Sequence, residues 1–194
     1  MLKKILIGLA VLVAVFVAVV VTRPDTFQVE RSQTIAAPAS VAYAQVADFR
    51  NWKSWSPWEK LDPAMKTSFG GTPGEVGSTY SWSGNSDVGI GKMTVLETKP
   101  GESVRIQLEF IEPYAATSES VFTFAPQGEG TQVKWVMTGD HNFMSKAMGL
   151  FMDMDAMIGK DFEKGLAQLG THAEASAKRQ AAEAAPAAVA APQQ

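Results

Sequence analysis

The 194-residue sequence contains no cysteine, and this absence excludes several kinds of chemistry. Without a thiol, the chain forms no disulfide, zinc–thiolate site, iron–sulfur cluster, thiol nucleophile or lipid-modified cysteine. The sequence has only two histidines, His141 and His172. They lie about 30 residues apart, with no glutamate at a helical offset from His141, so we expect no metal site. The formal net charge is -3 and the sequence has no cluster of Lys and Arg, which argues against a nucleic-acid partner.

Signatures of cofactor binding and of common catalytic sites are also lacking. The glycine-rich stretch Gly70 to Gly77 has no Lys-Ser/Thr ending of a phosphate loop, and no dinucleotide fingerprint precedes a helix. No serine lies in a nucleophile elbow. His141 follows a strand pattern, a position more typical of a solvent-facing loop histidine than of a general base. We therefore expect no cofactor, and we assign no catalytic residue.

A long hydrophobic run occurs at the start of the sequence. Residues Ile5 to Val21 are all apolar or small, after Lys3-Lys4 and before Arg23-Pro24. A run of about 17 residues is at the lower end of a bilayer span and longer than the apolar core of a signal peptide. Because Phe16-Val17-Ala18 is a poor cleavage site, we predict an uncleaved membrane anchor over residues 1–25. Secretion after signal cleavage is the alternative.

The positive-inside rule predicts the topology of this anchor. Lys3 and Lys4 would remain in the cytoplasm, and a single span would place the soluble domain outside it. In a Gram-negative cell that location is the periplasm.

The rest of the chain changes from strand periodicity to helix periodicity. Thr26 to Ile35 alternates apolar and polar residues, as in a half-buried strand, and Ala37-Pro38 starts a helix that ends near Asp48. Short antiparallel strands follow. We predict them at residues 79–83, 88–98, 103–110, 117–124 and 131–138. A long amphipathic helix comes last, because apolar residues recur at helical spacing from Phe151 to Leu169.

These elements predict one α+β domain over residues 26–172. The apolar face of an antiparallel sheet needs a cover, and the long C-terminal helix is the one element large enough to provide it. We therefore expect a curved sheet of about six or seven strands wrapped around that helix. Residues 173–194 are rich in Ala, Glu and Gln, and we predict a disordered tail there.

Several motifs occur in an order known from one superfamily. They are the strand before Ala36-Ala37-Pro38-Ala39-Ser40-Val41, the segment Phe49 to Trp58 followed by Asp62-Pro63, the stretch Gly74 to Gly84, and the strand Gly130 to Trp135. In this order the chain resembles the START-like helix-grip superfamily, also called SRPBCC, and in particular its bacterial polyketide cyclase/dehydrase-like proteins. The resemblance implies a helix-grip fold with a cavity between sheet and helix. It implies no particular activity, because the superfamily includes lipid carriers, hormone receptors and cyclases.

Aromatic and methionine side chains suit the lining of such a cavity, although each of them taken alone is more typical of a protein core. The candidates on the loop and strands are Trp55, Trp58, Tyr80, Trp82, Met93, Phe110, Phe124, Trp135 and Met137. The candidates near the start of the long helix are Met148, Phe151 and Met152.

Three functions stay open at this point. The first is a membrane-tethered binding protein for a hydrophobic small molecule or lipid. The second is an enzyme of the cyclase, dehydratase or hydrolase type, which needs a polar pair that faces the cavity. The third is an envelope scaffold or interaction protein that uses exposed tryptophans between Trp52 and Trp58. The sequence leaves the ligand and the oligomeric state open, and it favours binding over catalysis.

Overall fold

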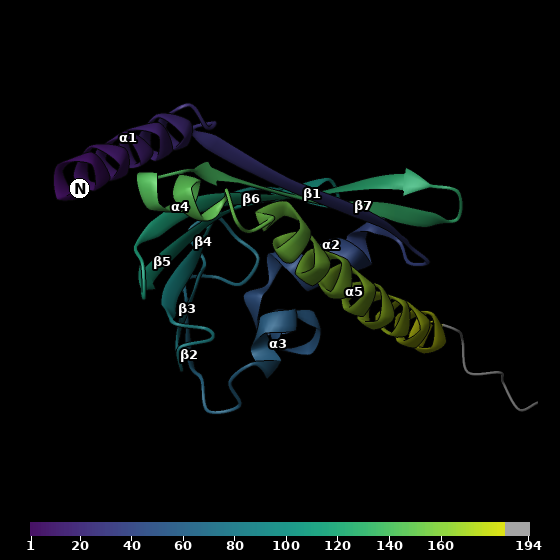
Figure 1. Ribbon diagram of the computed structural model, residues 1–194. Helices are drawn as coiled ribbons and strands as arrows, with labels where there is room; N and C mark the ends of the chain where they lie inside the picture. The colour runs from purple at the N-terminus through teal and green to yellow at the C-terminus, as the bar shows by residue number, and fades with distance from the viewer. Residues whose placement is uncertain (185–194) are drawn as a thin grey trace, which may run out of the picture.

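A seven-stranded antiparallel sheet organises the domain in the computed structural model, which describes residues 1–184 (Figure 1). The strands are β1 Thr26–Ile35, β2 Lys66–Gly70, β3 Thr79–Ser83, β4 Ile90–Lys99, β5 Ser103–Glu112, β6 Ala116–Gln127 and β7 Gly130–Asp140. Their order in the sheet is β1-β7-β6-β5-β4-β3-β2. Strands β2 to β7 thus pair in chain order, and β1 completes the sheet beside β7. The predicted number and antiparallel arrangement of the strands are confirmed.

Alternation along the strands separates an apolar face from a polar face. On β5, Val104 and Ile106 are fully buried, whereas Arg105 between them points to the other face. Arg105 forms ion pairs there with Glu97 on β4 and Glu119 on β6, at 3.4 and 3.2 Å. One face of the sheet is therefore available to pack against helices.

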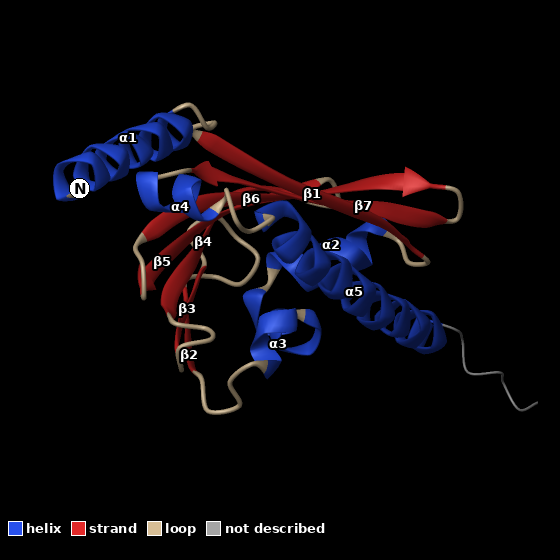
Figure 2. Cartoon of the chain, in the orientation of Figure 1, coloured by secondary structure: helices blue, strands red, loops and turns tan. Residues whose placement is uncertain are grey.

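The second, third and fifth helices of the chain cover that apolar face, and the first extends away from one end of the domain (Figure 2). The helices are α1 Leu2–Val21, α2 Ala39–Ala47, α3 Trp52–Trp55, α4 Phe143–Met148 and α5 Met154–Ala184, with 3-10 turns at Phe49–Asn51 and Pro57–Lys60. Helix α5 packs on β1, α2 and α3. Its buried residues Phe162, Leu166, Leu169 and Ala173 recur every three or four positions. The sheet with its long C-terminal helix confirms the helix-grip fold.

The start of the long helix differs from the prediction. Met148 ends the short helix α4, Phe151 and Met152 lie in a linker, and α5 begins only at Met154. The side chain of Asp153 accepts a hydrogen bond from the Ala156 N–H at 2.9 Å, which caps α5 at this point. Phe151 and Met152 are therefore not residues of the long helix.

The end of the long helix also differs, since α5 continues to Ala184. Residues 173–184, expected to belong to a disordered tail, are helical. Ala173 is fully buried and Ala177 packs against the core. Alanine has the highest helix propensity and packs without a bulky side chain, so a low content of large apolar residues was a poor guide here. The rest of the predicted tail, residues 185–194, lies outside the described residues.

Candidate functional site

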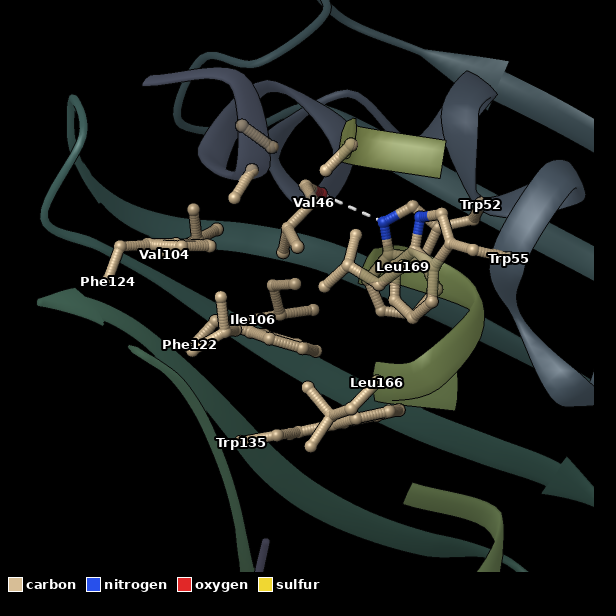
Figure 3. Close-up of a cluster of buried hydrophobic side chains, with 14 of the residues drawn as sticks. Val46, Trp52, Trp55, Val104, Ile106, Phe122, Phe124, Trp135, Leu166 and Leu169 are labelled. Carbon is tan, nitrogen blue, oxygen red and sulfur yellow. Dashed lines mark hydrogen bonds between the residues drawn. The ribbon is translucent and has the colours of Figure 1, made fainter. Parts of the chain in front are cut away.

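Aromatic side chains fill the space between the sheet and the middle of α5 (Figure 3). The Trp135 indole on β7 stacks on the Phe162 ring of α5, with 3.8 Å between centroids and 6° between planes. Phe122 also stacks on Trp135 at 4.6 Å, and Trp52 and Trp55 meet both rings edge-on. All five side chains are at most 4% exposed. This region is a packed core, and Trp52 and Trp55 form no exposed patch of the kind that a scaffold role would use.

The nine predicted lining residues of the loop and strands lie in this core or at its border. Trp55, Tyr80, Met93, Phe124, Trp135 and Met137 are buried, whereas Trp58, Trp82 and Phe110 are half-buried. The Tyr80 hydroxyl donates a hydrogen bond to Glu59, and burial together with this bond raises the pKa of Tyr80. A role in ligand binding for these nine residues stays a prediction.

An open groove of about 560 Å³ lies between the start of β1 and the linker that joins α4 to α5. Its volume is within the usual range for small-molecule sites, about 300–1,000 Å³. It is lined by Phe27, Gln28, Val29, His141, Gly149, Leu150, Phe151, Met152, Asp153, Met154 and Asp155. Of the predicted residues, Phe151 and Met152 line the groove, and Met148 precedes it on α4.

The sequence reasoning missed most of this lining. Phe27 and Val29 were assigned only to the buried face of a strand, and Leu150 was not singled out. The available signal was the density of Met and Phe between Phe143 and Met157, which exceeds what one helical face can bury.

His141 lies among the groove residues and is fixed by local hydrogen bonds. Its backbone N–H donates to the Asp25 carbonyl oxygen at 2.7 Å, and its Nδ1 lies 3.2 Å from Ser145 Oγ. The Ser145 hydroxyl donates to the Asn142 carbonyl oxygen, so Nδ1 of His141 is the donor to Ser145. These partners are not carboxylates, so His141 does not form a His–acid pair. Within residues 1–184, no group of three or more His, Asp or Glu side chains is placed to hold a metal ion.

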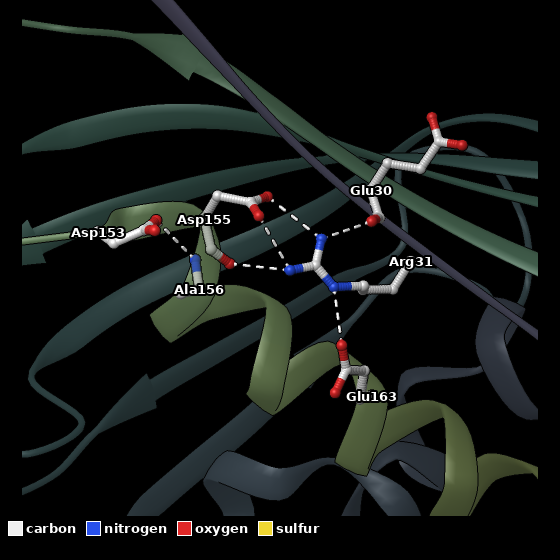
Figure 4. A network of polar contacts seen from close by, with 6 residues as sticks. All are labelled: Glu30, Arg31, Asp153, Asp155, Ala156 and Glu163. Carbon is white, nitrogen blue, oxygen red and sulfur yellow. Dashed lines mark hydrogen bonds and ion pairs between the residues drawn. The ribbon is translucent and has the colours of Figure 1, made fainter.

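Arg31 on β1 fixes the first turns of α5 beside the groove (Figure 4). Its guanidinium donates to both carboxylate oxygens of Asp155, at 3.0 and 3.2 Å, and to Glu163 at 2.9 Å. A Cβ at Gly159 would overlap this guanidinium, so the glycine is what gives it room. The hydrogen bonds to Arg31 hold the Asp155 pKa below its ordinary value. Because Asp155 lines the groove, this network fixes one of its walls.

Helix α1 joins the domain at the same end as the groove. It is long and apolar enough for a membrane span or a signal sequence, with a mean hydropathy of 3.0, and nearly all of it is exposed. Lys146 on α4 forms an ion pair with Asp25, just after α1, and this contact lowers the Asp25 pKa. Helix α1, α4 and the groove are therefore neighbours.

Solved structures of other proteins share this architecture. Among solved structures, a protein of Chromobacterium violaceum superposes with a TM-score of 0.55 at 18% identity, covering 78% of this chain and 99% of that chain. The di-domain ARO/CYC StfQ from the steffimycin biosynthetic pathway gives 0.60 at 11% identity, covering 79% and 52%. Major latex-like protein 151 from Panax ginseng gives 0.55 at 14% identity, covering 77% and 98%. No curated protein matches the sequence.

The structural similarities establish the fold, and the family follows from the sequence. A family model described as polyketide cyclase / dehydrase and lipid transport matches residues 26–174, which is the whole sheet and most of α5. The chain therefore belongs to the polyketide cyclase / dehydrase and lipid transport family.

Proposed function

We propose that this protein binds a hydrophobic small molecule or lipid in the groove between β1 and the α4–α5 linker, while α1 tethers it to a membrane. The observation that carries the proposal is a groove of about 560 Å³, lined on part of its surface by apolar side chains, at the end of the domain where α1 joins. Phe27 and Leu150 supply apolar lining, and polar groups come from Gln28, His141, Asp153 and Asp155. Apolar walls together with polar groups that converge on the same space are typical of sites that orient a small molecule.

A membrane tether would explain why the groove lies at the end of the domain next to α1. An apolar ligand is far more concentrated in a bilayer than in water, because transfer of apolar surface out of water is favourable. A groove held next to the bilayer therefore meets its ligand at a high local concentration. With Lys3 and Lys4 in the cytoplasm, the domain lies on the opposite side of the membrane.

A pair of matched leucine substitutions tests the groove. Leu150→Asp introduces a carboxylate into the groove lining, and we expect it to weaken binding at least about tenfold, a change of about 1.4 kcal/mol. Leu61→Asp makes the same change at an exposed leucine outside the groove and serves as the control. The measurement is the dissociation constant of a fluorescent fatty acid for the full-length protein in amphipol.

Equal affinity of the two aspartate variants would contradict the proposal. Mass spectrometry of an organic extract of the wild-type protein, purified from membranes, then identifies the natural ligand. Wild-type protein that carries no apolar molecule and binds none from a broad panel would also contradict it.

A cyclase- or dehydratase-type reaction is the second candidate, favoured by the position of His141 among the groove residues. A general acid or base has to come within hydrogen-bond distance of the substrate, and Nε2 of His141 is the free ring nitrogen. The polar pair Tyr80–Glu59 lies outside the groove lining and does not fill this role. Recovery of the ligand chemically unchanged after incubation with the protein supports binding, and a converted product supports catalysis.

A further inference from the structure

Exposed apolar side chains cover α4 and the linker after it. Phe143, Met144, Met148, Phe151 and Met152, which we call the α4 surface, are between 40% and 81% exposed. Monomeric soluble proteins scatter such residues singly, and a contiguous group of them marks a contact site. Phe151 and Met152 also line the groove, so the α4 surface borders the groove directly.

The α4 surface lies at the end of the domain where the anchor joins. The chain from Val21, which ends α1, to Thr26, which starts β1, spans at most about 18 Å when fully extended. The ion pair between Lys146 and Asp25 and the hydrogen bond from the His141 N–H to the Asp25 carbonyl oxygen hold α4 to this segment. Figure 1 shows α1 and α4 side by side, and they are in contact. A bilayer that holds α1 is therefore within reach of the α4 surface.

We propose that the α4 surface docks into the interfacial layer of the bilayer that holds α1. The inference rests on the membrane tether of the proposed function. Phenylalanine and methionine side chains enter the boundary between headgroups and acyl chains favourably. Lys146 adds no uncompensated charge, because its side chain is only 10% exposed and is paired with Asp25.

Docking in this position turns the groove toward the bilayer. Phe151 and Met152 then lie at the boundary between lipid and groove, and an apolar ligand passes between the two without crossing water. The same residues would contact the bilayer before binding and the ligand afterwards.

Site-specific fluorescence in vesicles tests the docking. Because the sequence has no cysteine, one introduced thiol reports on one position. Full-length Met144→Cys, Phe151→Cys and Glu129→Cys proteins are labelled with the fluorophore NBD. They are reconstituted into phosphatidylcholine vesicles with or without lipids that carry a nitroxide quencher near the headgroup. Glu129 is the control, because it is exposed in the turn before β7, roughly 33 Å along that strand from Asp140.

We expect the quencher lipid to reduce emission at least about twofold at positions 144 and 151 and to leave position 129 unchanged. Labels at 144 and 151 that remain as unquenched as the label at 129 overturn the docking. Blue-shifted emission at 144 and 151 without lipid quenching also overturns it, because a second copy of the chain then covers the surface.

Two measurements on the same samples keep this inference separate from the proposed function. They are retention of the protein in the vesicles after an alkaline carbonate wash, and binding of the fluorescent fatty acid by the proteins labelled at positions 144 and 129, which lie outside the groove lining. Retained, ligand-binding protein with unquenched labels refutes the docking alone. Protein released by carbonate refutes the tether, and the docking with it.

Discussion

Removal of the Phe162 ring tests whether the middle of the space between sheet and helix is packed core. Phe162 is fully buried and stacks on Trp135 at 3.8 Å, with an edge contact to Trp58 at 6.4 Å. A buried Phe→Ala change costs about 3–5 kcal/mol, and aromatic pairs add about 0.5–1.5 kcal/mol beyond area burial. Because the stacked partner Trp135 is itself held by further rings, we expect Phe162→Ala to lose about 4–5 kcal/mol. For a domain of this size that is a fall of roughly 8–20 °C in melting temperature.

The assay is thermal unfolding of the full-length protein in detergent, followed by near-UV circular dichroism. Phe151→Ala is the matched control, since its side chain is 81% exposed and surface changes usually stay within about 0.5 kcal/mol. The space left by the Phe162 ring is apolar, so benzene is expected to raise the melting temperature of Phe162→Ala more than that of the wild type. A loss below about 1 kcal/mol, comparable to the control, would refute the packed-core reasoning.

Two further predictions concern the start of α5. Gly159→Ala places a Cβ where the Arg31 guanidinium lies and is expected to lower the melting temperature. Its control is Gly170→Ala in the same helix, whose Cβ would meet its nearest neighbour at 3.5 Å, and it is expected to be neutral or to stabilise the protein by up to about 1 kcal/mol. Equal effects of the two substitutions would argue against the Arg31 contact. The Asp155 pKa lies below its ordinary value of 3.8 because of Arg31, so the stabilisation is present above that pH and is lost as the pH falls through the lowered pKa. The melting-temperature difference between wild type and Arg31→Met is therefore expected to be constant from pH 6 to about pH 5 and to shrink below about pH 4; a difference that grows toward low pH would contradict the assignment.

Strand positions were predictable because strand periodicity is a local property. Residues 79–83 were predicted as a strand and form β3 with the same bounds. The strand predicted at 103–110 is β5, which runs two residues further to Glu112. Every second residue of a strand faces the core, so the residue types alone carry this information.

The start of α5 was less predictable, because the apolar spacing indicated one continuous helix whereas the capping residues indicated two. Phe151 and Met154 are three residues apart, which suits a continuous helix. Gly149 ends α4, however, and Asp153 caps α5 through the Ala156 N–H. Both residue types are typical of helix ends, and they separate two helices where the apolar pattern suggested one.

Core and ligand-lining residues were the hardest to separate, because both use the same residue types. Trp135 is core because α5 approaches it closely at a glycine. A Cβ at Gly165 would lie 3.1 Å from the Trp135 ring and 3.3 Å from Pro57. This close approach brings Phe162 into stacking distance of Trp135. The sequence contains the glycine but does not reveal which distant side chain it faces.

The energetics of the two regions favour the groove over the core as the place for the proposed ligand. A ligand in the middle of the domain would have to displace the Trp135–Phe162 stack, at a cost comparable to the loss predicted for Phe162→Ala. A ligand in the groove beside α1 needs no such displacement, since the groove is already open. Arg31 holds the first turns of α5 in place through Asp155 and Glu163. The groove beside the linker before Met154 therefore does not weaken the start of the helix. Under the proposed function, stability and binding are thus assigned to different parts of α5, and the part next to α1 offers apolar surface without the loss of core packing.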